Sequence, residues 1–370
     1  MTEAARKPEG SYRCALIQAW GPWPPEATNK MKTMLKSTIE KGIAFLCSQQ
    51  HSNGTWQDFH LPTGISDSWV TAYIGLHLYW VCIEYNSSPR ENNLARAAHW
   101  LASHSLKNGG WSYNAHCAAD SDTTAHTILF LQKLGEPVSP KSYDFLLSFQ
   151  NQDGGFGTYH YFIEGDTWGQ SHPDVTPVAA IALAEHLKNY PVKLKNLLAY
   201  IRLNQNQNGL WESFWWKTPL YSTTRNLDSV QELGIDYDQQ SLKRSLLNLN
   251  GRIPFDMALA LYCRLRLSLW SDLLPRVKVL CKSQLPDGSW PSFPGLRLTS
   301  RRCRKPWRVS TSGRLYSDQN RLFTSATVLR SLSLYYALYF DYTSLPSIPA
   351  LERPGPVHHR KTLYTYMSVL

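Results

Sequence analysis

The sequence has little charge and few of the features that direct a chain to a membrane or to the secretory route. Charged residues make up 18% of the 370 residues and hydrophobic residues 43%, which is typical of a globular rather than a disordered protein. The longest uncharged stretch, residues 68–83, is shorter than the roughly 20 residues that span a bilayer. The polar first ten residues have no apolar segment of a secretory signal. We therefore expect neither a transmembrane segment nor export.

Cysteine is also sparse and lacks any pairing pattern. The seven cysteines are odd in number, widely scattered along the chain and include no CxxC pair. A disulfide framework would need paired cysteines at regular spacing. We therefore expect reduced thiols and a cytoplasmic location.

Basic residues, in contrast, are in excess, with a formal net charge of +10. Many of them fall in one stretch of the chain, namely Arg297, Arg301, Arg302, Arg304, Lys305, Arg308, Arg314 and Arg321. Such a stretch forms a solvated loop, binds an anionic ligand such as diphosphate, or contacts a membrane surface or nucleic acid. No nucleic-acid-binding motif accompanies it, so we expect no nucleic acid partner.

A repeated turn organises the chain. Four copies share a glutamine, a glycine four residues later and an aromatic residue two further on: Gln50/Gly54/Trp56, Gln150/Gly154/Phe156, Gln205/Gly209/Trp211 and Gln284/Gly288/Trp290. A fifth copy at Gly109, Gly110 and Trp111 has Ser105 in place of the glutamine. The interval of 79 residues between Trp211 and Trp290 is long enough to contain a degenerate copy near Gly251. About six units are therefore predicted.

Each unit has the pattern of a helix, a glycine turn and a second, more apolar helix. We expect the glycine to end the first helix, and an Asp or Thr to begin the second, as at Asp67, Asp122, Asp174 and Thr324. Six such pairs predict an all-α fold, an (α/α)6 barrel (toroid) in which the apolar helices form the inner wall. The predicted domains are an N-terminal extension over residues 1–30, one barrel over residues 31–345 and a tail over residues 346–370.

The aromatic residues of the repeat and those outside it have different expected roles. In the turns, the amide can bond open backbone groups at helix ends while the indole packs over the next turn, so these residues join neighbouring repeats. Outside the turns, aromatic side chains either pack in the core or line a cavity. The candidates for a cavity are Trp69, Trp168, Trp215, Trp216 and Tyr221.

The run from Asp120 to Ala125 places two carboxylates two positions apart before an apolar helix. A single Asp at this point would cap the helix, and Asp67 and Asp174 stand at comparable points of other repeats. This run alone has a doubled carboxylate, followed by two threonines. Two close carboxyls cannot both ionise cheaply, so the pair can hold a proton at neutral pH. It is therefore a candidate proton donor.

This run, Asp120-Ser121-Asp122-Thr123-Thr124-Ala125, resembles the Asp-X-Asp-Asp-Thr-Ala signature of the class II terpene cyclases. Squalene-hopene and oxidosqualene cyclases share that signature, the glutamine-tryptophan repeat and the α-barrel, and the resemblance extends from about residue 42 to residue 338. It implies that Asp122 is the general acid that protonates an alkene or epoxide and that Asp120 is its hydrogen-bonding neighbour. Thr123 replaces the third carboxylate, as in the similar Asp-X-Asp-Thr-Thr forms of bacterial drimane-type cyclases.

The resemblance also implies the substrate and what the reaction needs. Protonation requires no cofactor, and Mg²⁺ would enter only with a diphosphate substrate; no protein-bound metal is expected. Because family members usually have two barrels, one barrel suits a short polyprenyl substrate such as farnesyl diphosphate. Arg301 and Arg302 would then meet the diphosphate, and aromatic faces would stabilise the carbocation. A second subunit that completes the cavity and peripheral membrane contact are both compatible with this reading.

Two motifs of related proteins are missing from the sequence. It has no Asp-X-Cys-Tyr motif, which supplies zinc ligands in prenyltransferase β-subunits, and no Asp-Asp-X-X-Asp cluster of class I synthases. Two other functions stay open: a non-catalytic barrel that binds a lipid or a partner, and another enzyme on the same barrel. A lyase or glycan-processing enzyme would use Asp122 with Glu164 or Asp166.

Overall fold

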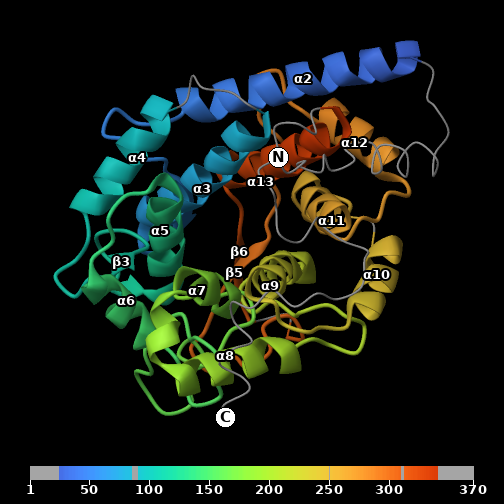
Figure 1. The fold of residues 1–370 in the computed structure, drawn as a ribbon. Coiled ribbons are helices and arrows are strands. Elements are labelled where there is room, and N and C mark those ends of the chain that lie inside the picture. Colours follow the sequence, from blue (N-terminus) through green and yellow to red (C-terminus); the bar gives the residue numbers. More distant parts are fainter. Residues whose placement is uncertain (1–24, 86–90, 250, 310–311, 341–370) are drawn as a thin grey trace, which may run out of the picture.

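The computed structural model describes residues 25–85, 91–249, 251–309 and 312–340, which form two concentric rings of helices (Figure 1). The inner helices are α3 (Ser68–Tyr85), α5 (Ser121–Leu134), α7 (Thr176–Ala182), α9 (Pro219–Leu233), α11 (Pro254–Arg266) and α13 (Leu322–Phe340). The outer helices are α2 (Pro25–Ser48), α4 (Glu91–Ser103), α6 (Pro140–Leu147), α8 (Pro191–Leu203), α10 (Gln239–Asn248) and α12 (Leu273–Lys282). A short 3-10 helix, His186–Asn189, follows α7.

The inner ring is closed. Each inner helix packs against the next along the chain, and α13 packs against α3. Outer helix α2 contacts both α12 and α13, so the first and last described pairs meet. The predicted all-α (α/α)6 barrel is therefore confirmed. Of the predicted flanking segments, residues 1–24 and 341–370 lie outside the described residues, and the domain boundaries stay a prediction.

The burial of the two rings follows from their sequences. In α13 every residue from Leu322 to Leu338 is buried, because this helix is apolar on all sides and lies between two neighbours and an outer helix. In α10, by contrast, the buried residues are Ser241, Leu242 and Leu246, all on one face. A helix that is apolar on all sides, such as α13, therefore occupies the inner wall, as the sequence predicts.

The repeated turns join neighbouring pairs as predicted. The indole nitrogens of Trp56, Trp111, Trp211 and Trp290 each donate to the carbonyl ten residues earlier, at 2.7 to 2.9 Å. Each glutamine amide donates to the carbonyl of its own glycine and to a carbonyl of the next outer helix or its cap. For Gln50 these acceptors are Gly54 (2.9 Å) and Asn93 (2.8 Å). The turn thus satisfies backbone groups on two helices at once.

The glycines have a different role from the one predicted. The outer helices α2, α4, α6, α8 and α12 end about six residues before the turn glycine, so the glycine does not terminate them. Its backbone has positive φ, as at Gly209 (φ 81°), and it packs against the next outer helix. A Cβ atom there would lie 2.1 Å from the backbone nitrogen of Leu242. Only glycine satisfies both the conformation and this close approach.

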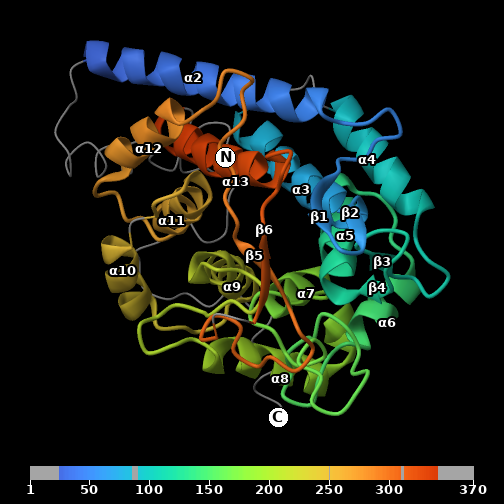
Figure 2. The same ribbon diagram turned by 180° about the vertical axis from the view of Figure 1, so that it is seen from behind.

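Short antiparallel hairpins cover the end of the barrel where the inner helices begin. They are β1 (Asp58–Leu61) with β2 (Gly64–Ser66), β3 (Trp111–Ser112) with β4 (Ala119–Asp120), and β5 (Leu296–Thr299) with β6 (Gly313–Tyr316). Figure 2 shows β5 and β6 crossing the barrel axis. A bridge from Leu296 to Trp216, just before α9, fixes the hairpin over the inner helices. We call this the capped end and the other the far end.

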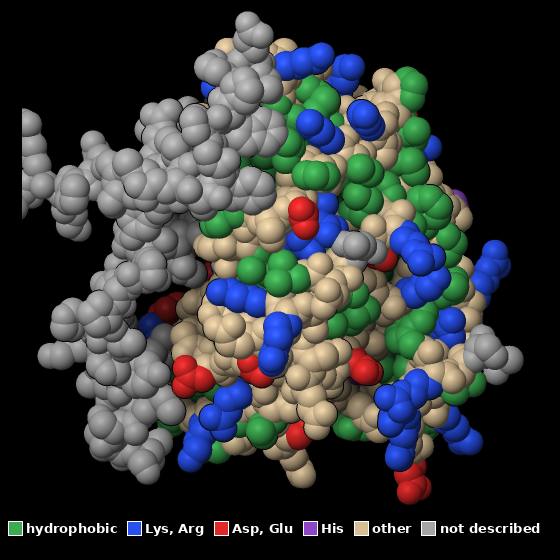
Figure 3. All heavy atoms as spheres, turned by 90° about the vertical axis from the view of Figure 1, so that its right-hand side faces the viewer, with side chains coloured by type: hydrophobic (Ala, Val, Ile, Leu, Met, Phe, Trp, Pro, Cys, Tyr) green, Lys and Arg blue, Asp and Glu red, His purple; other side chains and the backbone are tan. Residues whose placement is uncertain are grey.

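The long interval between the last two turn aromatics is also explained. It contains α10 and α11, joined by a short connection in which Gly251 packs against Asp256 and Met257. The predicted sixth unit is therefore present without its glutamine and tryptophan. The face that carries α10 and α12 shows Lys and Arg side chains spread among hydrophobic ones (Figure 3), so positive charge is not gathered into one patch there.

Candidate active site

A hydrogen bond that recurs in five of the six repeats aligns their inner helices with one another. The backbone N–H of the turn aromatic donates to a hydroxyl near the start of the inner helix, on Thr71, Thr124, Thr176, Thr223 and Ser325. The position two residues before this hydroxyl forms the first inner layer: Trp69, Asp122, Asp174, Tyr221 and Phe323. The position two residues after it forms the second layer: Tyr73, His126, Val178, Arg225 and Thr327. Asp122 thus belongs to the inner wall.

Asp120 is the N-cap of α5 and is held by Thr123. One carboxylate oxygen accepts the Thr123 backbone N–H at 2.7 Å, and the other accepts the Thr123 hydroxyl at 2.8 Å. Burial raises the pKa of Asp120 to about 7, although the Thr123 N–H lowers it and the charge of Asp122 raises it further. Asp120 is therefore the N-cap of α5, and its buried carboxyl binds a proton more readily than an exposed aspartate does.

Asp122 lies in the first turn of α5 and is the more accessible acid of the run. Its side chain is 19% exposed, whereas Asp120 is 3% exposed. Its Oδ1 has no hydrogen-bond partner among the described residues. The closest donor is Nδ1 of His126, 3.3 Å from Oδ1, so this oxygen lies in a largely buried wall without a well-formed hydrogen bond.

His126 lies one helical turn beyond Asp122 on α5. Its Nδ1 is 3.0 Å from the backbone carbonyl of Asp122 and 3.3 Å from its Oδ1. Because a carbonyl only accepts, Nδ1 carries a proton. Nε2 is buried without a partner among the described residues, and His126 lines the central cavity.

Asp174 differs from its prediction as a helix cap. The N-cap position of α7 is Val175, and the carboxylate of Asp174 turns instead to the loop before α9. Its Oδ2 accepts the backbone N–H groups of Phe214 (2.9 Å) and Trp215 (2.8 Å), while Oδ1 has no partner among the described residues. The residue is 1% exposed, and burial raises its pKa to about 7. Sequence reasoning missed this acid as part of the site.

The predicted cavity aromatics separate into two groups. Trp69, Trp216 and Tyr221 belong to one cluster with Phe323 at the capped end of the barrel. The ring centroids are 5.1 Å apart for Trp69 and Phe323, 5.1 Å for Trp216 and Phe323, and 4.6 Å for Trp216 and Tyr221. Trp69, Tyr221 and Phe323 share the first inner layer with Asp122. This cluster therefore provides aromatic faces at the level of the acid.

Trp168 and Trp215 form the second group, in the loops beside the start of α5. Their ring centroids are 5.3 Å apart, and the Trp215 indole donates to the hydroxyl of Thr158 at 2.8 Å. The backbone carbonyl of Thr158 in turn accepts the N–H of Ser121 at 3.0 Å. This chain of contacts places Trp215 next to the Asp120–Asp122 segment.

Arg301 and Arg302 lie on the capped end, outside the cavity. Arg301 stacks over Trp168, with 4.4 Å between the guanidinium carbon and the ring centroid, and pairs with Asp166 at 2.6 Å. Arg302 is exposed. Other arginines of the same stretch also have internal partners, since Arg297 donates to the Pro306 carbonyl and Arg321 pairs with Asp287.

A cavity of about 370 Å³ lies inside the inner ring, between the second layer and the far end. All six inner helices contribute to it, and its apolar wall is formed by Leu76, Leu129, Val178, Ile181 and Leu259. Asp122 lies one helical turn before His126 on α5, and neither it nor Asp120 or Thr123 lines this cavity. None of the seven predicted binding residues lines the cavity itself. The size lies at the lower end of the range of roughly 300 to 1,000 Å³ for small-molecule pockets.

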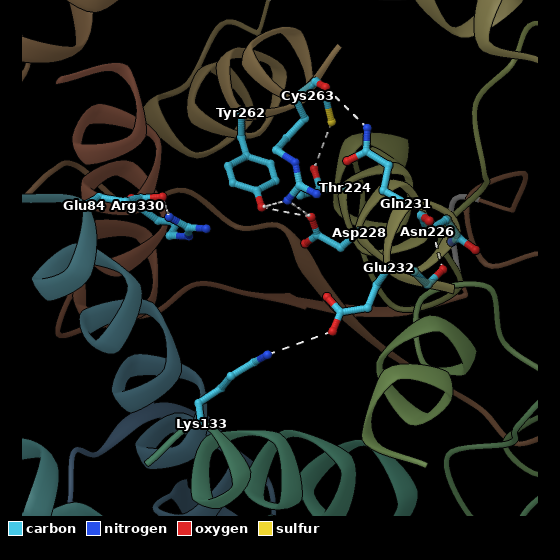
Figure 4. A network of polar contacts seen from close by, with 12 residues as sticks. Glu84, Lys133, Thr224, Asn226, Asp228, Gln231, Glu232, Tyr262, Cys263 and Arg330 are labelled. Carbon is cyan, nitrogen blue, oxygen red and sulfur yellow. Dashed lines mark hydrogen bonds and ion pairs between the residues drawn. The ribbon is translucent and has the colours of Figure 1, made fainter. Parts of the chain in front are cut away.

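Charged residues ring the far end of the cavity as neutral pairs (Figure 4). Lys133 on α5 reaches Glu232 on α9 at 3.9 Å. Arg266 on α11 pairs with Asp228 on α9 at 2.7 Å, and the hydroxyl of Tyr262 donates to the same carboxylate. Each of these two cations therefore has its own carboxylate.

A further pair links α13 to α3, between Arg330 and Glu84. Arg330 also stacks at 5.0 Å over Trp80, a ring that Lys133 approaches at 5.3 Å. The far end of the cavity therefore combines an aromatic face with cations that carboxylates already neutralise.

Arg225 in the second layer was not predicted as a site residue. It lies over the rings of Tyr73 (5.1 Å) and Tyr221 (5.3 Å), and its Nη2 is 3.5 Å from Nε2 of His77. It has no ion-pair partner within 4.0 Å among the described residues. Nothing around Arg225 in the sequence marks it, but its position two residues after Thr223 would have placed it in the inner wall.

The described residues show neither a metal site nor a membrane-spanning helix. They contain no group of three or more His, Cys, Asp or Glu side chains arranged to hold a metal ion. No helix in the described ranges combines the length and the apolar character needed to cross a bilayer.

Known proteins were compared with the chain in three ways, and no protein family model matches it. The squalene-hopene cyclase of Schizosaccharomyces japonicus is 24% identical over 208 residues, covering 46% of this chain and 32% of that protein. The lanosterol synthase of Pneumocystis carinii is 28% identical over 159 residues, covering 34% and 22%. The matched segments thus span a third or less of these relatives.

Among solved structures, the type II terpene cyclase MstE from Scytonema is similar over nearly its whole length. It is 26% identical, with a TM-score of 0.69 over 83% of this chain and 99% of that chain. A variant of MstE bound to its substrate, geranylgeranyl dihydroxybenzoate, has a TM-score of 0.70. The likeness therefore extends over nearly the whole of that chain.

Proposed function

We propose that this chain, which belongs to the class II terpene cyclase superfamily, cyclises a linear isoprenoid by protonating it with Asp122. The observation that carries the proposal is the place of Asp122 in the first inner layer. There its partly exposed side chain lies one helical turn before His126, which lines a cavity whose wall is made by all six inner helices. A protonated carboxyl in such a place can transfer a proton to an alkene carbon.

The aromatic cluster supports the steps that follow protonation. The proton leaves Asp122 and forms a C–H bond, and the positive charge then moves along the folded chain as each ring closes. Trp69, Trp216 and Tyr221 present aromatic faces at this level, where cation–π attraction contributes roughly 0.5 to 2 kcal/mol each. Trp168 and Trp215 lie close enough to the start of α5 to extend this surface. The buried surroundings exclude water that would capture the cation early.

The cavity supports a short amphipathic substrate. Its apolar wall suits an isoprenoid chain, and its charged far end suits a polar head group. We propose a C15 chain such as farnesyl diphosphate, or another short polyprenyl compound. Arg301 and Arg302 would bind its diphosphate only if the head group reached the capped end; Lys133 and Arg266 at the far end are the alternative contacts.

The remaining requirements follow from the chemistry. Class II cyclases begin with protonation and need no cofactor, so Mg²⁺ would enter here only as a counterion of a diphosphate. We propose a cytoplasmic enzyme with a small-molecule isoprenoid substrate. Peripheral contact with a membrane and a second subunit over the far end are both compatible with the cavity position.

The test is to incubate the purified protein with linear isoprenoids from C10 to C30, with and without Mg²⁺, and to identify products by mass spectrometry. We expect a cyclic product from the parent protein. Asp122→Asn should lower its formation by about 100-fold or more, because no other group supplies the first proton. Asp67→Asn, which changes a helix-capping acid of the preceding repeat, is the matched control and should retain activity.

Two other outcomes would replace the proposal. Full activity of Asp122→Asn, with the fold retained by circular dichroism, would exclude Asp122 as the proton donor. Binding of an isoprenoid without any conversion would instead support a lipid-binding barrel. Conversion of a polysaccharide by the same protein would support the glycan-processing alternative.

A further inference from the structure

We propose that the central cavity binds the head group of the substrate at Arg225, and that this head group is a carboxylate. The inference rests on the proposed function and selects one class among the short polyprenyl compounds, a linear isoprenoid acid. Arg225 is not one of the arginines that the sequence marks as candidates for an anionic ligand. Those candidates, Arg301 and Arg302, lie on the capped end, outside the cavity.

Arg225 is held in the cavity wall by two aromatic rings and one histidine. It lies in the second inner layer on α9 and lines the cavity. Its guanidinium carbon is 5.1 Å from the ring centroid of Tyr73 and 5.3 Å from that of Tyr221, and its Nη2 is 3.5 Å from Nε2 of His77. Burial lowers the pKa of His77 well below its ordinary value, so this ring is neutral. These contacts orient the guanidinium without neutralising it.

Two donors at this place in the wall have no acceptor. The Nε of Arg225 and the hydroxyl of Tyr221, one helical turn earlier on α9, are both buried without a hydrogen-bond partner among the described residues. A buried donor without an acceptor is costly. Although burial lowers the pKa of Arg225, Tyr73 and Tyr221 raise it above its ordinary value, so the guanidinium is charged. The wall therefore lacks an anion at Arg225.

The other cations that line the cavity already have carboxylates. The pairs are Lys133 with Glu232, Arg266 with Asp228 and Arg330 with Glu84 (Figure 4). Among the described residues of the lining, Arg225 is the cation that forms no such pair. The cavity therefore has one positive charge in excess, and it lies at Arg225.

A carboxylate matches this excess of one charge better than a diphosphate does. The planar guanidinium can bind both oxygens of a carboxylate through two parallel N–H donors. A diphosphate carries more than one negative charge. The carboxylates of Asp228 and Glu232 line the same cavity and would repel the charge that Arg225 does not balance. An uncharged head group would leave the guanidinium without an anion.

The position of Arg225 relative to Asp122 fits a short, folded chain. Asp122 lies in the first layer on α5, Arg225 lies in the second layer on α9, and α7 packs against both helices. The head group at Arg225 and the alkene at Asp122 are therefore separated across the barrel and not along it. Leu129 on α5 and Val178 on α7 provide apolar wall between them. A short isoprenoid held at both places is folded, as ring closure requires.

The first experiment measures the head-group preference of the whole protein at pH 7. Isothermal titration calorimetry compares three C15 probes that share one chain: farnesoic acid, farnesol and farnesyl diphosphate. We expect the acid to bind about tenfold or more tightly than either of the others, because it alone matches one unpaired guanidinium. Equal binding of the acid and the alcohol, or tighter binding of the diphosphate, would overturn the inference.

The second experiment changes Arg225. In Arg225→Gln the affinity for farnesoic acid should fall by about tenfold or more, while the affinity for farnesol should change by less than about twofold. Arg225→Lys keeps the charge but not the planar fork, and its loss should be intermediate. The matched control is Arg202→Gln, which removes an exposed arginine of the outer helix α8 and should leave both affinities unchanged. Parent-like binding of the acid by Arg225→Gln would contradict the inference.

Lys133→Gln tests the far end as the competing contact. Because Glu232 already neutralises Lys133, the affinity for farnesoic acid should fall less in this variant than in Arg225→Gln. A larger loss in Lys133→Gln would place the head group at the far end and overturn the inference. If Arg225→Gln fails to fold, the preference of the parent protein among the three probes still decides the question.

Failure of this inference can be told apart from failure of the proposed function. Asp122→Asn should bind farnesoic acid as the parent does, while it forms no cyclic product. Full product formation by Asp122→Asn would reject the proposed function, whatever the affinity for the acid. Loss of product in Asp122→Asn, together with parent-like binding of the acid by Arg225→Gln, would reject the inference alone.

Discussion

Thr123 divides the roles of the two acids in the run. Its N–H and its hydroxyl both bond Asp120, and its backbone carbonyl accepts the hydroxyl of Thr127 at 2.9 Å. Asp120 is thereby fixed as a cap, while Asp122, one residue before Thr123, keeps a partly accessible carboxyl. A carboxylate at position 123 would instead add a third negative charge beside Asp120. Thr123 therefore fixes the position of Asp120, and because its side chain is uncharged it does not compete with the two acids for a proton.

This arrangement predicts the effect of removing one hydroxyl. Thr123→Val keeps the shape of the side chain and the N–H bond but loses the hydrogen bond to Asp120. We expect the free energy of unfolding to fall by about 1 kcal/mol, measured by urea unfolding. Thr123→Ser keeps the hydroxyl and should lose much less. Equal losses in the two variants would mean that the methyl group, and not the hydrogen bond, matters.

At the scale of single residues, the sequence predicted the acids of the run but not their neighbours. Asp120 and Asp122 lie on one short segment, so their spacing is visible in the sequence. Asp174 was interpreted as a helix cap because its partners, Phe214 and Trp215, come from a loop about forty residues later. Arg225 carries no local signal at all. Contacts between distant segments decide both roles, and no periodicity within one helix reports them.

Among the elements, the repeated turn follows a constant geometry. The turn glycine packs against the peptide after Arg96, Lys141, Asn196, Ser241 or Lys41. In the four copies with a glutamine, the glutamine amide donates to a backbone carbonyl that lies three residues earlier in the chain than the first residue of this peptide. The four acceptors are Asn93, Lys193, Asp238 and Thr38. The same offset in the copy with Ser105 points to the carbonyl of Val138. The turn with Ser105 therefore lacks the hydrogen bond that the glutamine amide makes in the other four turns.

The constant offset predicts two opposite effects. Gln50→Ala should lower the free energy of unfolding by about 1 to 3 kcal/mol, because the bonds to Gly54 and Asn93 are lost. Gln49→Ala, which changes the exposed glutamine next to it, is the control and should have little effect. Ser105→Gln should raise the free energy of unfolding by about 0.5 to 1 kcal/mol. Thermal and urea unfolding of the three variants would measure these differences.

A stabilised Ser105→Gln variant would support the offset directly, since a loop substitution elsewhere seldom stabilises a protein. A destabilised variant would show that the fifth turn has a different path from the other four.

The elements themselves were largely predictable because the turns repeat. The inner and outer helices follow from apolar periodicity between successive glycines. The three hairpins were not predicted, because their strands are two to four residues long and leave too short an alternation to recognise. The segment between Trp290 and Leu322 was noted only for its arginines, yet it contributes the β5–β6 cap. The end of each outer helix was also misplaced, since the glycine serves packing rather than termination.

For the whole molecule, buried acids make stability depend on pH. Burial raises the pKa of Asp120, Asp174 and Asp318 to about 7, from an ordinary value of 3.8. Between these values the folded protein binds more protons than the unfolded chain, so its stability falls as pH rises. His172, with a pKa lowered to about 4 from 6.5, acts in the opposite direction: its contribution is lost as pH falls below 6.5. Above pH 6.5 the three buried aspartates, and not His172, determine whether stability rises or falls with pH.

The free energy of unfolding should therefore decrease from pH 6.5 to pH 8, by about 1 kcal/mol or more per pH unit. Urea unfolding at several pH values would measure the slope. Asp318→Asn removes one of the three acids and should make the slope shallower. A stability that stays flat or rises over this range would mean that these acids are already ionised in the folded protein.

Ring closure between α13 and α3 and between α2 and α12 has a consequence for synthesis on the ribosome. Helix α3 cannot pack against α13 until α13 has emerged from the ribosome, some 240 residues later. Until then the nascent chain is an open arc whose two apolar edges face solvent. Local pairs can form early because each turn joins adjacent helices, but the cavity exists only after the arc closes. The same closure that encloses the site makes the growing chain most vulnerable to aggregation just before it is complete.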